Sequence, residues 1–274
     1  MAEYVVNRDG TELAVAESGV GPAVLLAHGL TASRRYVVMG STALERSGHR
    51  VIGYDARGHG RSSPAPHPAD YTYEDLGHDM EAVLDAAGVQ RAVLAGVSMG
   101  AHTLLRLALH RPDRVAGIVV ITPAYDGTPD LGPARLAHWD ALSAGLREGG
   151  IEGFIAAQGE PRVPERRRET VLKVIRQRLA VHEHPEAVAD ALAAVPRSRP
   201  FGAIAELSAI AVPAAIVASD DEADPEHPRA IGEAYADAIP GARLIGDEPG
   251  HSPVAWQGSQ LSRVIAEVAD EARW

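Results

Sequence analysis

The sequence predicts an α/β fold in which a mostly parallel β-sheet carries helices on both faces. Short apolar runs alternate along the chain with longer stretches of helical periodicity. The runs are apolar at nearly every position, as is typical of strands buried on both faces of a parallel sheet. The 274 residues, 46% of them hydrophobic, suffice for one large domain, with or without an insertion.

The expected elements begin with a hairpin, because Asp9-Gly10 separates two short extended runs, residues 4–7 and 12–17. The further expected strands are Ala23–Ala27, Arg50–Tyr54, Ala92–Val97, Val115–Ile121, Ala214–Ala218 and Ala242–Ile245. The expected helices between and after them are Tyr73–Ala87, Gly100–His110, Pro228–Ile239 and Gln260–Arg273.

The alternation of strands and helices stops near Pro123 and resumes after Pro200. Between them we expect only helices, separated by breakers at Gly149-Gly150 and Pro161. These helices are Ala134–Arg147, Ile151–Gln158, Glu165–Val181 and Pro185–Ala194. The sequence therefore predicts a core of residues 1–123 and 201–274 with a helical cap of residues 124–200.

Composition narrows the classes of partner. A net charge of −11 disfavours contact with nucleic acid and anionic membranes, and the Arg166-Arg167-Arg168 run is expected to be a solvated helix face. The chain has no cysteine, which excludes disulfides, thiolate catalysis and cysteine-ligated zinc. No apolar stretch reaches the ~18 residues of a membrane span, and the N-terminus lacks the pattern of a secretory signal. We expect a cytoplasmic protein that acts on a small molecule, and the sequence leaves a homodimer open.

The motif Gly96-Val97-Ser98-Met99-Gly100 fits the pattern G-x-S-x-G. In this pattern a nucleophilic serine requires an abrupt turn from a strand into a helix, with the serine exposed at its apex. An apolar run precedes the motif and an Ala/Leu-rich helical pattern follows it. Ser98 is therefore the predicted nucleophile.

A serine hydroxyl needs a base, and histidine is the usual one because its pKa lies near neutrality. His251 follows the last expected strand and would lie at the carboxyl edge of the sheet, so we predict it as the base. His28, His59 and His102 compete for this role. The first two lie early in the chain, and His102 is one turn into the helix after Ser98, so we expect structural roles for all three.

The acid is expected between Ser98 and His251, in the loop after the strand Ala214–Ala218. This loop offers several carboxylates, of which we favour Asp224 because Asp-Pro precedes the next helix. Asp221 and Glu222 remain alternatives. The loop lacks the glycine and the ligand spacing of a calcium-binding EF-hand, so we predict no metal site.

An oxyanion needs two preorganised N–H donors, and the backbone amides of Leu30 and Met99 are the candidates. His28-Gly29 would then shape the loop that carries Leu30. We interpret the glycine-containing segment 55–62 as structural. The sequence contains no phosphate-binding glycine motif, so we expect no nucleotide, and we predict no other cofactor.

Together these motifs resemble those of the α/β-hydrolase superfamily, in its serine-nucleophile branch. The resemblance implies an eight-stranded core, a helical cap and a Ser–Asp–His triad, and it is strongest to small bacterial carboxylesterases, enol-lactonases and cofactor-free haloperoxidase-like hydrolases. Serine at position 98, in place of aspartate, argues against the epoxide-hydrolase and haloalkane-dehalogenase branches. The acid loop departs from the family pattern, with Ser219 where glycine is common and with extra residues. The motifs are His28-Gly29-Leu30, residues 55–62, residues 96–100 and Pro249-Gly250-His251.

The sequence thus predicts a serine hydrolase that cleaves an ester or lactone of a small, largely apolar substrate through an acyl-enzyme. Trp139 and Phe154 in the cap are candidates for an apolar substrate wall, although packing between cap and core would also explain Trp139. C–C bond hydrolysis and acyl transfer would use the same triad. A protein of this fold that only binds a ligand is a third alternative.

Overall fold

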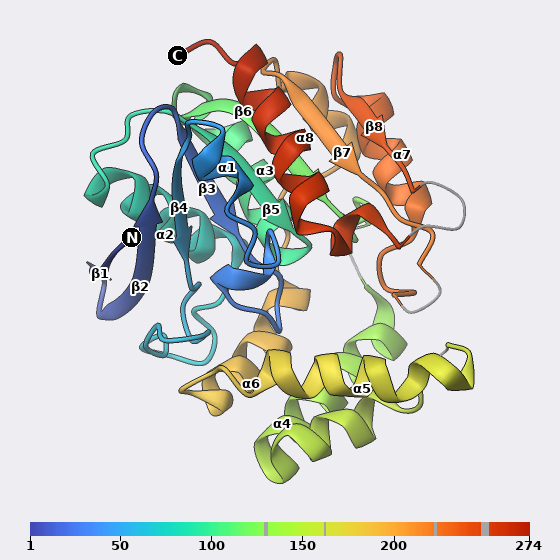
Figure 1. Ribbon diagram of the computed structural model, residues 1–274. Helices are drawn as coiled ribbons and strands as arrows, with labels where there is room; N and C mark the ends of the chain where they lie inside the picture. Colours follow the sequence, from blue (N-terminus) through green and yellow to red (C-terminus); the bar gives the residue numbers. More distant parts are fainter. Residues whose placement is uncertain (129–130, 162, 222–223, 248–251) are drawn as a thin grey trace.

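Eight strands form one sheet in the computed structural model, which describes residues 1–128, 131–161, 163–221, 224–247 and 252–274 (Figure 1). Their order across the sheet is β1-β2-β4-β3-β5-β6-β7-β8. The pairs β1–β2 and β2–β4 are antiparallel, and all the others are parallel. The strands are β1 (Ala2–Arg8), β2 (Thr11–Ser18), β3 (Ala23–Ala27), β4 (Arg50–Tyr54), β5 (Ala92–Val97), β6 (Val115–Ile121), β7 (Ala214–Val217) and β8 (Arg243–Ile245). This topology confirms the predicted fold class.

The predicted hairpin joins β1 to β2. Arg8 pairs with Thr11, which leaves Asp9 and Gly10 as a two-residue turn. Both have positive φ, 48° and 83°, as the tight hairpin turn between twisted strands requires.

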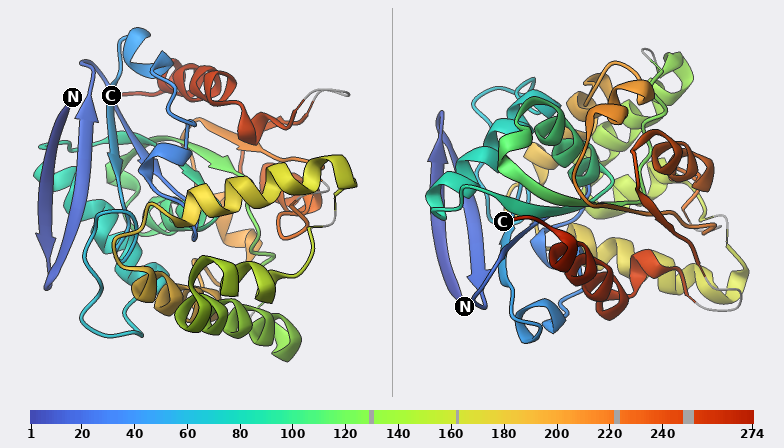
Figure 2. Two further views of the ribbon diagram at one scale, coloured as in Figure 1. Left: turned by 60° about the horizontal axis from the view of Figure 1, so that its bottom comes forward. Right: turned by 90° about the horizontal axis from the view of Figure 1, so that it is seen from above.

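Helices cover both faces of the sheet because the central strands are apolar on both sides (Figure 2). Leu25 and Leu94 pack with one set of helices, whereas Val24 and Val93, their neighbours in the chain, pack with the other. The first set is α2 (Tyr73–Ala86), α3 (Met99–His110) and α7 (Arg229–Ala238), and the second is α1 (Ala43–Arg46) and α8 (Gly258–Glu271).

Between β6 and β7 the described residues form helices and turns. These helices are α4 (Gly132–Gln158), α5 (Glu165–Leu179) and α6 (Pro185–Ala194), which lie together at one end of the sheet (Figure 1). Gly150 interrupts α4 with φ of 59°, at the predicted breaker. The three helices share an apolar cluster of their own, which includes Leu146, Ile175 and Leu192. We call residues 132–194 the helical segment.

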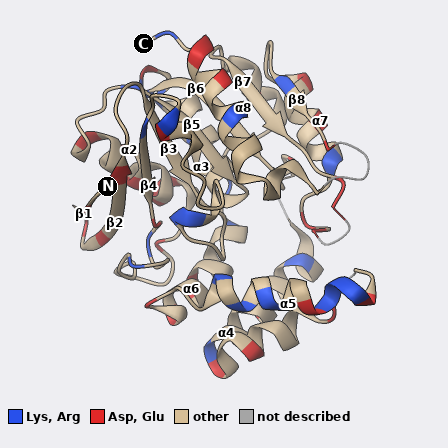
Figure 3. Ribbon diagram, viewed as in Figure 1, with Lys and Arg blue, Asp and Glu red and all other residues tan. Residues whose placement is uncertain are grey.

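Basic side chains are concentrated on α5, in a chain whose net charge is −11 (Figure 3). Arg166 and Arg167 are exposed there and Arg168 is partly exposed, as a solvated helix face requires. None of the helices in the described ranges is long and apolar enough to cross a membrane.

Candidate active site

Ser98 lies at the turn between β5 and α3, in a backbone conformation that is rare for a residue with a side chain. Its φ is 50° and its ψ is −110°. The Ser98 N–H donates to the carbonyl oxygen of Ile121 (3.0 Å), and the His102 N–H donates to that of Ser98 (3.0 Å). The end of β6 and the first turn of α3 therefore hold the serine in this conformation, which costs ~1–3 kcal/mol elsewhere in proteins.

The two glycines of the motif allow this turn because the backbones approach closely. A Cβ atom on Gly96 would lie 2.5 Å from the carbonyl carbon of Gly100. A Cβ atom on Gly100 would overlap the carbonyl oxygen of Ala27, at the end of the neighbouring strand. The absence of a side chain at both positions thus provides the space that the turn at Ser98 requires.

An imidazole lies at hydrogen-bonding distance from the Ser98 hydroxyl. It belongs to His227, whose Nε2 is 2.7 Å from Ser98 Oγ, and whose Nδ1 is 2.6 Å from Asp224 Oδ1. An ionised carboxylate only accepts hydrogen bonds, so Nδ1 carries the proton and Nε2 is free to accept the Ser98 O–H. This is the arrangement that general-base activation of a serine requires.

A tight turn brings Asp224 and His227 together. The segment Asp224-Pro225-Glu226-His227 is closed by a hydrogen bond from the His227 N–H to the Asp224 carbonyl oxygen (3.2 Å). Proline is favoured at the second position of such turns, and their first and fourth residues are close in space. The sequence analysis did not consider His227 as a partner of Ser98, although its spacing from Asp224 across a proline was a signal that the two side chains lie close together.

Of the other predicted triad candidates, His251 and Glu222 lie outside the described residues. Asp221 is described, and it accepts a hydrogen bond from the Trp256 indole N–H (2.8 Å). Asp224 is thus the predicted carboxylate that the structure connects to Ser98, through His227, and its catalytic role remains a prediction. Among the described residues, no three histidines or carboxylates are grouped so as to hold a metal ion.

The predicted oxyanion donors come from loops on both sides of Ser98. β3 and β5 are neighbours in the sheet, so the loop after β3 lies beside the Ser98 turn: a Cβ atom on Gly29 would be 3.6 Å from the Ser98 Cβ. Met99 is the first residue of α3, and N–H groups of a first helical turn have no acceptor within the helix. The positive end of the helix also favours a negative charge there.

His102 is close to the site but is occupied by backbone hydrogen bonds. Its Nε2 accepts from the N–H groups of Ala124 (3.1 Å) and Tyr125 (3.2 Å), so the proton is on Nδ1, which donates to the Tyr73 hydroxyl (3.0 Å). Burial, with a smaller effect of nearby His227, lowers the pKa of His102 to about 3. These contacts agree with the expected structural role.

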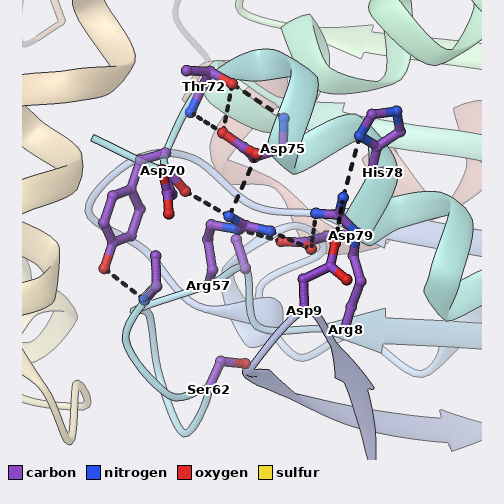
Figure 4. A network of polar contacts seen from close by, with 12 residues as sticks. Arg8, Asp9, Arg57, Ser62, Asp70, Thr72, Asp75, His78 and Asp79 are labelled. Atoms are coloured by element: carbon purple, nitrogen blue, oxygen red, sulfur yellow. Dashed lines mark hydrogen bonds and ion pairs between the residues drawn. The ribbon is translucent and has the colours of Figure 1, made fainter. Parts of the chain in front are cut away.

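The 55–62 segment is held by a buried ion pair, shown in Figure 4. Arg57 contacts both carboxylate oxygens of Asp79, on α2, at 2.7 Å and also donates to the Asp70 carbonyl oxygen (2.6 Å). Ser62 Oγ donates to the Asp55 carbonyl oxygen (2.6 Å), which closes the segment. These contacts support a structural role for its polar residues.

The two aromatic residues that the sequence analysis predicts to touch substrate pack within the helical segment. Phe154 is 3% exposed in the segment's apolar cluster, and Trp139 is partly buried against the same cluster. The structure thus gives both side chains a packing role, and a contact with substrate remains a prediction.

Comparison with known proteins adds independent findings. A family model described as alpha/beta hydrolase fold matches residues 22–186. An enol-lactonase from Burkholderia xenovorans LB400 superposes with a TM-score of 0.79 and 25% identity over 98% of this chain and 100% of that chain. A thermophilic esterase from Thermogutta terrifontis gives a TM-score of 0.79 and 28% identity over 98% of each chain. The chain therefore matches these structures from end to end.

Sequence similarity to curated relatives extends over a smaller part of the chain. The sn-1-specific diacylglycerol lipase ABHD11 of Mus musculus is 35% identical over 146 residues, which are 53% of this chain and 41% of that protein. Other relatives of similar identity include proteins named epoxide hydrolase. The chain spans half or less of the length of the curated relatives it matches.

Proposed function

The chain belongs to the α/β hydrolase fold family, and on this premise we propose that it is a serine hydrolase that cleaves carboxylic esters or lactones. The observation that carries the proposal is the 2.7 Å contact between Ser98 Oγ and an imidazole whose other nitrogen is bonded to a carboxylate. The esterase and enol-lactonase among the similar structures support these substrate classes. A serine at this position favours acyl transfer over the chemistry of an aspartate nucleophile.

The proposed cycle has two steps. Ser98 attacks the substrate carbonyl while the imidazole takes its proton, and the amides of Leu30 and Met99 stabilise the oxyanion that forms. The imidazolium then protonates the leaving oxygen, which leaves an acyl-enzyme. Water, deprotonated by the same imidazole, attacks the acyl group and releases the acid.

His227 is the base in this proposal because it contacts Ser98 directly. The chain order Ser98, Asp224, His227 is also the order of nucleophile, acid and base that accompanies the G-x-S-x-G motif. His251, outside the described residues, is the base predicted from the sequence. The two assignments differ in one measurable consequence, given in the Discussion.

We further propose that residues 124–200 form a cap over a core of residues 1–123 and 201–274. The position of α4, α5 and α6 at one end of the sheet supports this division (Figure 1). An apolar cap would favour a small, largely apolar substrate, with Trp139 and Phe154 shaping its wall.

The test is chemical labelling combined with turnover. A fluorophosphonate probe is expected to modify Ser98, and Ser98→Ala is expected to abolish both the labelling and p-nitrophenyl acetate hydrolysis. Ser208→Ala, an exposed serine outside the site, is the matched control and retains both. Equal ester turnover by wild type and Ser98→Ala would refute the proposal.

A further inference from the structure

Three buried histidines from distant parts of the chain lie side by side near the nucleophile. His28 follows β3, His59 is in the segment after β4, and His182 connects α5 to α6. They are 2%, 0% and 9% exposed. The ring of His59 is 5.2 Å from that of His28 and 5.5 Å from that of His182, measured between centroids.

Each ring faces one of three successive carbonyl oxygens in the loop after β3. His28 Nδ1 is 2.8 Å from the Gly29 oxygen, and His59 Nε2 is 2.5 Å from the Leu30 oxygen. His182 Nε2 is 3.2 Å from the Thr31 oxygen. Residues 29–31 therefore have their carbonyl groups directed at imidazoles.

Backbone donors assign the proton on two of the rings. The Ala56 N–H donates to His28 Nε2 (2.9 Å), and the Gly60 N–H donates to His182 Nδ1 (2.8 Å). In a neutral imidazole the remaining nitrogen carries the proton, so His28 Nδ1–H and His182 Nε2–H are donors to the loop. Burial is the largest cause that lowers the pKa of both rings to about 3, which keeps them neutral.

His59 differs because carbonyl oxygens face both of its nitrogens. Its Nδ1 is 2.8 Å from the Arg57 oxygen, in addition to the contact with Leu30. Burial lowers the pKa of His59 and disfavours the doubly protonated ring. We assign its single proton to Nε2, which has the shorter contact.

The carbonyl directions determine where the amides point. In a trans peptide the C=O of one residue and the N–H of the next are antiparallel. Holding the Gly29 oxygen therefore fixes the direction of the Leu30 N–H, and holding the Leu30 and Thr31 oxygens fixes the two peptides that follow. The Leu30 N–H is the proposed oxyanion donor, and this loop lies beside Ser98.

His182 links this loop to the helical segment. The next residue, Glu183, donates its N–H to the Gly60 carbonyl oxygen (2.9 Å), so both polar groups of the Gly60 backbone bond to residues 182–183. The Leu30 side chain also packs against the apolar cluster of the helical segment. The helical segment thus contacts the 55–62 segment through the Glu183 backbone, and the loop after β3 through the His182 ring and the apolar side chains around Leu30.

The Thr31–Ala32 peptide, whose carbonyl faces His182, donates its N–H to the Gly29 carbonyl oxygen (3.0 Å), and that oxygen belongs to the same peptide as the Leu30 N–H. We propose that His182 is a positioning residue that aligns the Leu30 amide for oxyanion binding through this peptide, by donating a hydrogen bond from Nε2 to the Thr31 carbonyl. This inference rests on the proposed function. It assigns to the helical segment a part in transition-state stabilisation in addition to any role in enclosing substrate.

Two substitutions separate the two hydrogen bonds of His182. In His182→Gln, the amide NH₂ can take the place of Nε2–H and donate to Thr31, whereas in His182→Asn the shorter side chain can only replace Nδ1. We expect His182→Asn to lower kcat for p-nitrophenyl acetate about tenfold, less than the full loss of an oxyanion donor, with KM changed less than about twofold. His182→Gln is expected to retain kcat within about threefold.

A tetrahedral-adduct inhibitor provides a readout that a merely structural role would not change. Affinity for a trifluoromethyl ketone is expected to fall in His182→Asn in parallel with kcat, because the adduct places an oxyanion against the same amides. His184→Asn, at the more exposed histidine two residues away, is the matched control and keeps wild-type kcat and affinity. Wild-type kcat and affinity in His182→Asn, or equal losses in His182→Gln, would overturn the proposal.

The tautomer of His182 can be measured in the wild-type protein, so this test does not depend on whether a variant folds. The ¹⁵N spectrum of labelled histidine at pH 7 is expected to show His182 as the Nε2–H tautomer, and the Nδ1–H tautomer would refute the inference. The proposed function fails separately, through absence of Ser98 labelling and turnover in the wild type. Normal turnover with an unaffected His182→Asn variant would reject the positioning role alone.

Discussion

At the scale of single residues, the site depends on one side chain held in a conformation that most residues avoid. Ser98 has positive φ, and hydrogen bonds of its own N–H and carbonyl groups hold it there. The hydroxyl then lies 2.7 Å from His227, whose other ring nitrogen contacts Asp224. Backbone strain and the hydrogen-bonded imidazole thus occur at the same residue, which is typical of functional sites.

The identity of the base is tested by paired substitutions. His227→Asn is expected to lower kcat at least about 10³-fold, because loss of a triad histidine removes general-base activation. His251→Asn is expected to retain most activity, and exposed His110→Asn is the control. Steady-state kinetics decide between the assignments: a fully active His227→Asn with an inactive His251→Asn would confirm His251, the base predicted from the sequence.

At the scale of elements, three loops at the carboxyl ends of β3, β4 and β5 support one another. The loop after β3 carries Leu30, the 55–62 segment carries His59, and the turn after β5 carries Ser98. The Arg57–Asp79 pair attaches the 55–62 segment to α2, and both side chains are almost inaccessible, at 3% and 0% exposure (Figure 4). Loss of this ion pair would therefore loosen the 55–62 segment, which carries His59 next to the loop of Leu30.

Removing one partner of the Arg57–Asp79 pair should lower the stability of the folded protein. Asp79→Asn leaves the buried Arg57 guanidinium with only the more distant carboxylate of Asp75 (3.8 Å), and loss of one partner of a buried ion pair lowers the free energy of unfolding by about 3–5 kcal/mol. Urea denaturation followed by circular dichroism measures the effect. Asp113→Asn breaks an exposed ion pair with Arg111 and should leave the midpoint unchanged. An Asp79→Asn midpoint equal to wild type would contradict the argument.

At the scale of the whole molecule, neutral buried histidines make stability depend on pH. Burial lowers the pKa of His28, His102 and His182 to about 3, whereas an unfolded histidine titrates near 6.5. Between these values the unfolded chain binds more protons than the folded one. The stabilisation is therefore complete above pH 6.5 and is lost as pH falls toward 3.

We expect the free energy of unfolding to fall by at least about 4 kcal/mol between pH 7.5 and 5.5, since each of the three rings loses about 1.4 kcal/mol one unit below 6.5 and buried His59 adds to the loss. Calorimetric Tm values across this range measure the loss. His182→Gln removes one titrating group and should reduce this loss by about 1.4 kcal/mol. A Tm that does not change between pH 7.5 and 5.5 would show that these rings are not buried in their neutral form.

Much of the fold could be predicted because it follows from patterns within single segments. Apolar runs such as Val115–Ile121 have to be buried on both faces, and the Asp9-Gly10 pair has to form a tight turn. The nucleophile turn is equally local, because Gly96 and Gly100 flank Ser98 in the sequence. The order and type of the strands and of the longer helices were therefore accessible from the sequence, whereas the four-residue helix α1 was not predicted.

The partners of the histidines were decided by tertiary structure alone. Thr31, Gly60 and His182 are far apart in the chain, and no periodicity links them. Nor does a strand or helix pattern reveal that His227, three residues after Asp224, reaches Ser98. Short-range preferences determine which segments form helices and strands, whereas a hydrogen bond of 3 Å depends on how several segments pack at once.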